Sequence, residues 1–167
     1  MKVSVYSRQA IETLINTPAE FPRNAAVISF SSPPREHRSA NPPVDYSNVC
    51  HRVFHVWIPD IDIEILPDYG YTFDSYLSEA DRIAEFIYQA RKDNCVLICQ
   101  CDYGQSRSAA CAAAILEHFE RRGIEIFADY RYYPNQLVYN KIKDALDRFS
   151  IAAKGQQKTP EQSAEGS

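Results

Sequence analysis

The stretch that decides the fold covers residues 94–108, "NCVLICQ" followed by "CDYGQSRS". Its first part is short and almost wholly apolar, which is typical of a central strand covered by helices on both faces. The alanine-rich segment that follows, "AACAAAILEHF", predicts a helix. Residues 101–107 therefore form a loop between the end of a buried strand and the start of a helix.

Outward from this stretch, strands and helices alternate along the chain. The predicted strands cover 2–7, 25–31, 51–59 and 94–100, and the predicted helices cover 8–17, 74–92, 107–122 and 133–149. This alternation predicts an α/β fold with a central, mostly parallel sheet flanked by helices.

Local signals mark the expected helix ends. Ser7 and Asp74 are suited to cap the first two helices, and Pro134 is suited to the first turn of the last one. Gly123 is placed to end the helix that follows the loop. Residues 32–47 are rich in proline and predict a long loop.

The chain of 167 residues has 45% hydrophobic and 24% charged residues, and its formal net charge is −4. These values predict one globular domain over 1–153, and the polar segment 154–167 predicts a disordered tail. An acidic balance argues against general nucleic-acid binding, and no apolar run reaches the roughly 18 residues of a membrane helix. Five cysteines at irregular spacings favour reduced thiols in the cytoplasm over disulfides or a zinc site.

The loop at 101–107 has the composition of an anion site. A loop that opens a helix presents unpaired backbone N–H groups and the positive end of the helix dipole. Gly104 allows the backbone to turn without a side chain in the way, and Arg107 can form two parallel hydrogen bonds to a tetrahedral oxyanion. The donors that bind an anion also favour the thiolate of Cys101, so the loop predicts a nucleophile beside a phosphate site.

The motif "CDYGQSRS" resembles the C-x2-G-x2-R-S signature of the cysteine-dependent protein tyrosine and dual-specificity phosphatases. The likeness extends loosely over residues 1–150, and "SAACAAAI" and "YYPNQLVYNKI" resemble small bacterial or phage members of that group. The resemblance implies the phosphatase fold and a reaction that needs no metal or cofactor. Most members have histidine before the cysteine, whereas Gln100 can orient the loop by hydrogen bonding but adds no charge.

The resemblance also implies roles for individual residues. Cys101 would attack phosphorus to form a phosphocysteine, and Ser108 would donate a hydrogen bond that helps the thiolate leave. The hydroxyl of Ser108 could equally open the helix. The phosphoryl oxygens would be bound by the loop residues Asp102, Tyr103, Gly104, Gln105, Ser106 and Arg107.

The leaving oxygen requires a proton, and a positioned acid contributes about a hundredfold to ten-thousandfold in rate. Asp60 is favoured because "WIPD" resembles the Trp-Pro-Asp loop of larger tyrosine phosphatases. Asp62 and Asp68 remain alternatives, and the spacing of Asp68 to Cys101 is closer to that in compact dual-specificity members.

Phosphotyrosine protein is the expected substrate class, because the loop carries Asp102 and no lysine, unlike phosphoinositide-selective relatives. One alternative is a phosphate-binding pseudophosphatase that acts as an interaction module. Another is a different Cys-x5-Arg enzyme, such as a sulfurtransferase or an arsenate reductase.

A few further residues carry weaker expectations. Cys99, two residues before Cys101 on a strand, should point to the same face and pack in the core. His37, with Arg35 and Arg38, is expected in a solvated loop that could touch an anionic substrate. Gln136 could orient the hydrolytic water, although the helix surface is its simpler place.

Overall fold

The structure, a computed structural model, describes residues 1–34 and 41–156. Its centre is a four-stranded sheet in the order β1-β4-β2-β3. The strands are β1 (Val3–Tyr6), β2 (Ala25–Ser31), β3 (Val53–Trp57) and β4 (Val96–Gln100), and every neighbouring pair is parallel. The predicted parallel α/β sheet is confirmed, with "NCVLICQ" supplying an inner strand.

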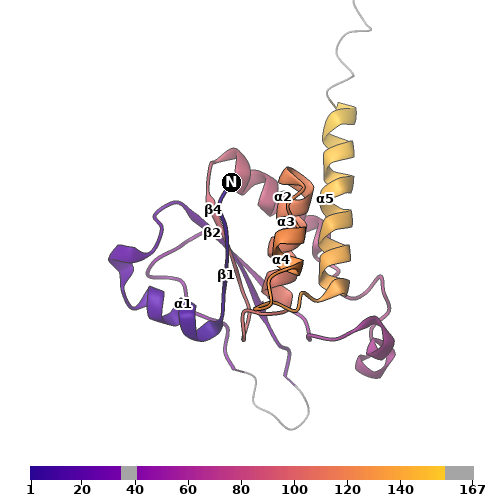
Figure 1. Cartoon of the computed structure of the whole chain (residues 1–167), viewed down its shortest axis with the longest axis horizontal. Coiled ribbons are helices and arrows are strands. Elements are labelled where there is room, and N and C mark those ends of the chain that lie inside the picture. Colours follow the sequence, from indigo (N-terminus) through magenta and orange to yellow (C-terminus); the bar gives the residue numbers. More distant parts are fainter. Residues whose placement is uncertain (35–40, 157–167) are drawn as a thin grey trace, which may run out of the picture.

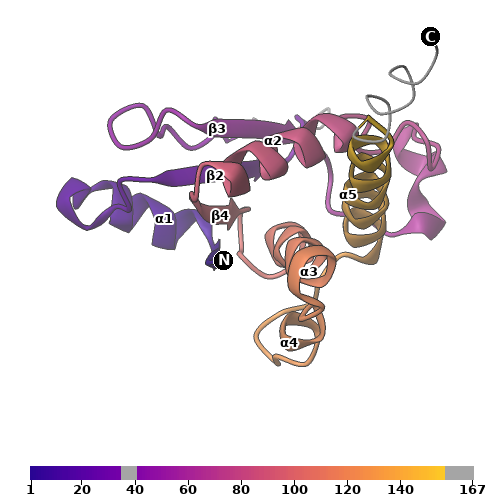
Figure 2. The ribbon, with the colours of Figure 1, turned by 90° about the horizontal axis from the view of Figure 1, so that it is seen from above.

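The helices are α1 (Arg8–Ile15), α2 (Ala80–Lys92), α3 (Arg107–Glu120), α4 (Ile124–Phe127) and α5 (Gln136–Gln156). Single turns of 3-10 helix lie at Pro18–Glu20, Ile63–Ile65 and Pro67–Tyr69. Figure 1 shows α1 on one side of the sheet, α2 and α3 on the other, and α5 outside those two helices. Figure 2 shows the same layers from above.

The two faces of the sheet bury different clusters because side chains alternate along a strand. On β2, Ala25 and Val27 pack with Ile11 of α1. The other face buries a larger cluster with α2, α3 and α5, and Cys99 and Cys101 both belong to it. The two cysteines therefore share a face, as predicted.

The parallel arrangement brings the carboxyl ends of all four strands to one edge of the sheet. Tyr6 is paired in register with Gln100, and Ser31 with Trp57. The residues that follow these strands lie at the same edge, which is where ligands bind in open α/β sheets.

The N-terminal cap of α1 is as predicted, because the Ser7 hydroxyl accepts a hydrogen bond from Ala10 N at 3.1 Å. The prediction that Asp74 caps α2 is wrong, because α2 begins at Ala80. Ser75 N donates to Thr72 Oγ1 at 3.1 Å and Thr72 N to Ser75 Oγ at 2.8 Å, so these two residues cap a local turn in place of Asp74. Leu77, with φ of 52°, then interrupts the right-handed helical conformation before Ala80.

The predicted end of α3 at Gly123 is also wrong. Arg121 takes the left-handed conformation, with φ of 56°, and Arg122 N donates to Leu116 O at 3.2 Å. Gly123 instead lies against α3, where a Cβ atom would be 2.9 Å from Ala113 O. Close packing, not backbone conformation, explains a glycine at this position.

The last helix begins two residues later than Pro134. Asn135 caps it, since Val138 N donates to Asn135 Oδ1 at 2.9 Å. The helix continues to Gln156, so Lys154 is helical and is not the first residue of a disordered tail. Residues 157–167 of the predicted tail lie outside the described residues. Within the part of the chain that the structure describes, no helix has the length and apolar content needed to cross a bilayer.

Candidate active site

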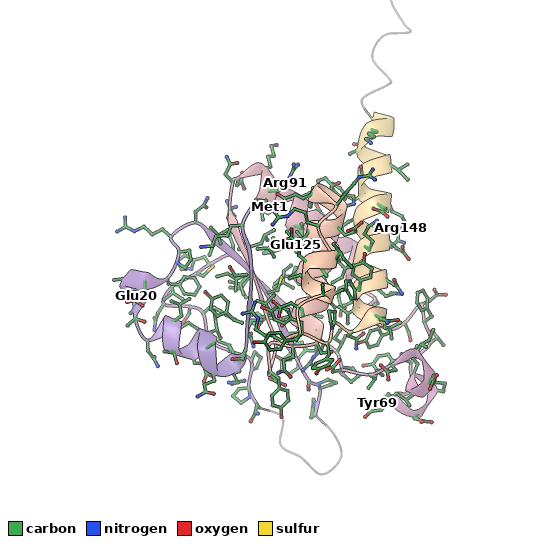
Figure 3. All side chains as sticks on the ribbon, in the orientation of Figure 1. Met1, Glu20, Tyr69, Arg91, Glu125 and Arg148 are labelled. Carbon is green, nitrogen blue, oxygen red and sulfur yellow. The ribbon has the colours of Figure 1, made fainter. Side chains whose placement is uncertain are left out.

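Cys101 is the first residue after β4 and lies at the carboxyl edge of the sheet. Its side chain belongs to the buried cluster, and the residue is 2% exposed. Cys101 N donates to Tyr6 O at 3.3 Å, and Arg8 N donates to Asp102 O at 3.1 Å. The loop is therefore attached to the junction between β1 and α1, and Figure 3 shows many side chains gathered around this edge.

The backbone N–H groups of residues 102–107 make no hydrogen bond to any group within 1–34 and 41–156. The carbonyls of Asp102, Gln105 and Ser106 accept hydrogen bonds from Arg8 N, Tyr133 N and Asn135 N at 3.1, 2.8 and 3.2 Å. In a planar trans peptide, the N–H points away from the carbonyl that precedes it. The N–H groups that follow these carbonyls therefore point away from the outer partners and are free to bind an anion.

Gly104 is required at its position for two reasons. Its φ is +67°, a conformation that residues with a side chain rarely adopt. A Cβ atom there would also lie 2.6 Å from Ser7 N. The positive φ agrees with the expectation that Gly104 lets the backbone turn. The close approach to Ser7 N shows in addition that the loop packs directly on the backbone of the β1–α1 junction.

Arg107 begins α3 and is 3% exposed. Its NH1 donates to Ile58 O at 2.8 Å and to Ser32 Oγ at 3.0 Å, and its NH2 lies 3.3 Å from Asp102 Oδ2. Arg107 Nε is buried and has no hydrogen-bond partner among residues 1–34 and 41–156. A buried guanidinium N–H without an acceptor is costly, so this group is available to an anion in the loop.

Ser108 and Cys101 are in direct contact, with 3.0 Å between Ser108 Oγ and Cys101 Sγ. Ser108 is fully buried in the first turn of α3. The positive end of the helix dipole is therefore close to the sulfur, and a hydroxyl is within reach to donate to it.

Gln100 lies under the loop in a buried polar network. Its Oε1 accepts hydrogen bonds from Ser29 Oγ at 2.6 Å and from Tyr46 OH at 2.9 Å. Burial raises the pKa of Tyr46 above its usual range, which keeps the hydroxyl protonated as a donor. The network fixes the residue before the cysteine without adding a charge.

Of the candidate acids, Asp60 is the one that contacts the loop. Asp60 Oδ1 accepts from Ser106 Oγ at 2.7 Å and from Asn135 Nδ2 at 2.8 Å. Asp62 and Asp68 are exposed, and neither side chain hydrogen-bonds to a described residue of the loop. The structure therefore joins Asp60 to the loop through Ser106 and shows no such contact for the two alternatives within the described residues, while the choice of Asp60 as the acid stays a prediction.

Ser32 and Asn135 are site residues that sequence reasoning missed. Asn135 lies within the helix predicted over 133–149, so its capping role was not predicted, and its contact with Asp60 depends on tertiary placement. Ser32 carries no local signal. Gln136 is exposed next to Asn135, while the predicted loop residues His37, Arg35 and Arg38 lie outside the described residues.

Comparisons with known proteins find the fold but no sequence relative. No protein-family profile and no curated protein sequence matches the chain. The structure of PTPMT1 in complex with PI(5)P matches with a TM-score of 0.53 and 14% identity, over 91% of this chain and 94% of that one. The structure of human DUSP28 matches with a TM-score of 0.52 and 14% identity, over 90% and 94% of the two chains.

Both neighbours are phosphatases of the protein tyrosine and dual-specificity family. The parallel four-stranded sheet with flanking helices is the protein tyrosine phosphatase fold. The fold class predicted from the sequence is therefore confirmed.

Proposed function

We propose that this protein is a phosphomonoester hydrolase of the protein tyrosine or dual-specificity phosphatase type. The observation that carries the proposal is a set of unused donors beside Cys101: the N–H groups of residues 102–107 and the buried Nε of Arg107. A buried guanidinium N–H without a partner is rare in proteins, and a tetrahedral dianion would satisfy it together with several N–H groups of the loop.

In the first step, Cys101 Sγ attacks phosphorus as the bond between phosphorus and the leaving oxygen breaks. Asp60 transfers its proton to that oxygen, so the alcohol or phenol leaves neutral. Arg107 and the loop amides stabilise the charge that develops on the phosphoryl oxygens. The product is a phosphocysteine on Cys101.

In the second step, a water molecule attacks the phosphocysteine and the sulfur–phosphorus bond breaks. The Asp60 carboxylate takes a proton from the water, which restores the acid, and inorganic phosphate is released. Ser108, at 3.0 Å from the sulfur, donates a hydrogen bond that stabilises the departing thiolate. The cycle consumes one water per phosphomonoester and needs no cofactor.

Phosphotyrosine protein is the proposed substrate class. One fold neighbour was solved with PI(5)P. In this chain, however, the loop carries the carboxylate of Asp102, whose Oδ2 lies 3.3 Å from Arg107 NH2. A negative charge beside the anion site disfavours a headgroup with additional phosphates. All five cysteines are free, which supports the predicted cytoplasmic location.

The test is hydrolysis of 4-nitrophenyl phosphate by the wild type and by Cys101→Ser. We expect a loss of about 10⁴-fold or more in kcat, because the nucleophile is removed. Cys95→Ser, at the opposite end of the same strand, is the matched control and should keep full activity. Mass spectrometry of acid-quenched wild type should detect a phosphoryl group on Cys101.

Two results would contradict the proposal. Binding of inorganic phosphate without turnover that depends on Cys101 would identify a phosphate-binding module. Turnover of thiosulfate faster than phosphate release would identify a sulfurtransferase.

A further inference from the structure

The carboxyl group of Asp60 is held asymmetrically. Ser106 Oγ and Asn135 Nδ2, from the loop and from the N-terminus of α5, both donate to Oδ1, at 2.7 and 2.8 Å. Oδ2 has no hydrogen bond to any group within 1–34 and 41–156. One oxygen is thus fixed as an acceptor, and the other remains free.

Asn135 connects three segments of the chain. Its Nδ2 also donates to Ile61 O at 3.0 Å, and its backbone N donates to Ser106 O at 3.2 Å. Its Oδ1 accepts from Val138 N, and the residue is only 7% exposed. A single buried residue therefore connects the segment that carries Asp60 to the first turn of α5 through its side chain, and to the loop through its backbone N–H.

Ser106 departs from what its position favours. It is the residue before α3, where a serine hydroxyl normally accepts a hydrogen bond from the first turn of the helix. In this structure the Ser106 side chain makes no such cap and donates to Asp60 instead. The helix gives up a stabilising contact, and Asp60 gains one.

We propose that Ser106 and Asn135 are positioning residues that fix Asp60 so that Oδ2 carries the proton for the leaving oxygen. A carboxylic acid has one O–H, and an oxygen that already accepts two hydrogen bonds is the one that stays a carbonyl. This inference rests on the proposed function. Asp60 itself is exposed, so without these two bonds its side chain could turn away from the loop. A misplacement of about 1 Å can lower a rate about 10²-fold.

The test compares two substrates that differ in their need for an acid. Phenyl phosphate releases phenol, whose pKa is about 10, like that of tyrosine, so departure needs protonation. 4-Nitrophenyl phosphate releases a stable phenolate, so its departure needs little protonation. The variant Asn135→Ser keeps an oxygen that can cap α5 but removes the amide donor to Asp60.

We expect Asn135→Ser to lower kcat/KM for phenyl phosphate by about tenfold to a hundredfold, and for 4-nitrophenyl phosphate by less than about threefold. Ser106→Ala should show the same selectivity, which keeps the test valid if Asn135→Ser folds poorly. In Asp60→Asn, the further change Asn135→Ser should cost little, because the two residues act as one unit. Asn24→Ser, which removes an amide that donates to Asp93 O and Asn94 O at the other edge of the sheet, is the control and should change neither rate.

Equal losses on both substrates would show a purely structural role for Asn135 and Ser106 and would overturn the inference, while leaving the proposed function intact. A wild type without turnover that depends on Cys101 would remove the proposed function itself. The pH–rate profile provides a second readout, since we expect its basic limb to flatten both in Asn135→Ser and in Asp60→Asn.

Discussion

The two edges of the sheet differ in whether their polar groups have hydrogen-bond partners. At the carboxyl edge, the N–H groups of the loop after Cys101 and Arg107 Nε have no partner in the part of the chain that the structure describes. Toward the amino edge, α2, α3 and α5 are joined by paired groups: His118 Nε2 is 2.6 Å from Tyr88 OH, and His118 Nδ1 is 2.7 Å from Asp147 Oδ1. Lys143 Nζ donates to the other oxygen of Asp147 at 2.7 Å.

A cavity lies at the edge of the sheet opposite to the proposed site. It has a volume of about 900 Å³ and opens beside Tyr88, Phe119 and Phe149, and no loop residue lines it. The polar groups around Tyr88 already satisfy one another, whereas those around Cys101 do not. Unused donors held in a fixed geometry identify an anion site better than volume does.

Among the changes that test the contrast between the two edges, the largest expected effect comes from replacing the guanidinium at the carboxyl edge. Arg107→Lys keeps the charge but loses Nε and the two-pronged geometry, so we expect kcat/KM for an aryl phosphate to fall by about 10³-fold. Arg148→Lys, in an exposed ion pair with Asp81, is the matched control and should retain the wild-type rate. If Arg107→Lys loses less than about tenfold, the free Nε is not what binds the phosphoryl group.

The next largest effect is a difference in stability between alanine variants of two glycines with positive φ. Gly104→Ala places a Cβ atom 2.6 Å from Ser7 N, whereas Gly70→Ala meets no atom within 4 Å. Holding an alanine in the left-handed conformation lowers the free energy of unfolding of both variants by about 1–2 kcal/mol. Only Gly104→Ala adds steric overlap, which lowers it by about a further 1–3 kcal/mol. Urea unfolding should show this difference, and the activity of Gly104→Ala should fall as well. Equal free energies of unfolding for the two variants would contradict the close packing of the loop on the β1–α1 junction.

A smaller effect is expected in the paired helical layer. Burial acts to raise the pKa of Asp147, but hydrogen bonds from Lys143 and His118 outweigh it and hold the pKa below its usual value. The stability from this carboxylate is therefore present above the unfolded pKa of about 3.9 and is lost as the pH falls through the lower folded value. Asp147→Asn should cost about 1 kcal/mol at pH 7 and less at pH 3, with unchanged turnover at pH 7. A loss of turnover in this variant would mean that the two edges are coupled.

The smallest effect concerns the carboxylate inside the loop. Asp102→Asn removes a negative charge next to Arg107, so inorganic phosphate should inhibit the variant about threefold more strongly. Asp144→Asn, exposed on α5, makes the same change in net charge far along the helix and should not alter inhibition. Weaker inhibition in Asp102→Asn would instead mean that Asp102 orients the guanidinium.

The local parts of this fold were readable from the sequence. The predicted strand at 25–31 has the observed bounds of β2, and all of its residues are buried. The loop at 101–107 was also readable, because a buried strand, a glycine and an alanine-rich helix constrain it locally. The ends of the helices were harder to predict from the sequence. Arg121, and not Gly123, takes the left-handed conformation after α3, because Gly123 packs against Ala113 and the chain turns before it.

The hydrogen bonds between the site residues could not be predicted from the sequence, because they join segments that are far apart in the chain. Asp60 was favoured on its neighbours in the sequence, yet its contacts with Ser106 and Asn135 depend on how α5 returns to the loop. Ser32 reaches Arg107 because β2 ends beside β4, a relation that strand order fixes and local sequence does not.

The support of the loop by the β1–α1 junction has a practical consequence. Tyr6 and Ser7 carry no chemistry of their own, but Gly104 rests on their backbone, and Tyr6 O holds the amide of Cys101. Removing residues 1–6 would delete β1 together with this support, so we expect the proposed activity to be lost although no group that meets the substrate is removed.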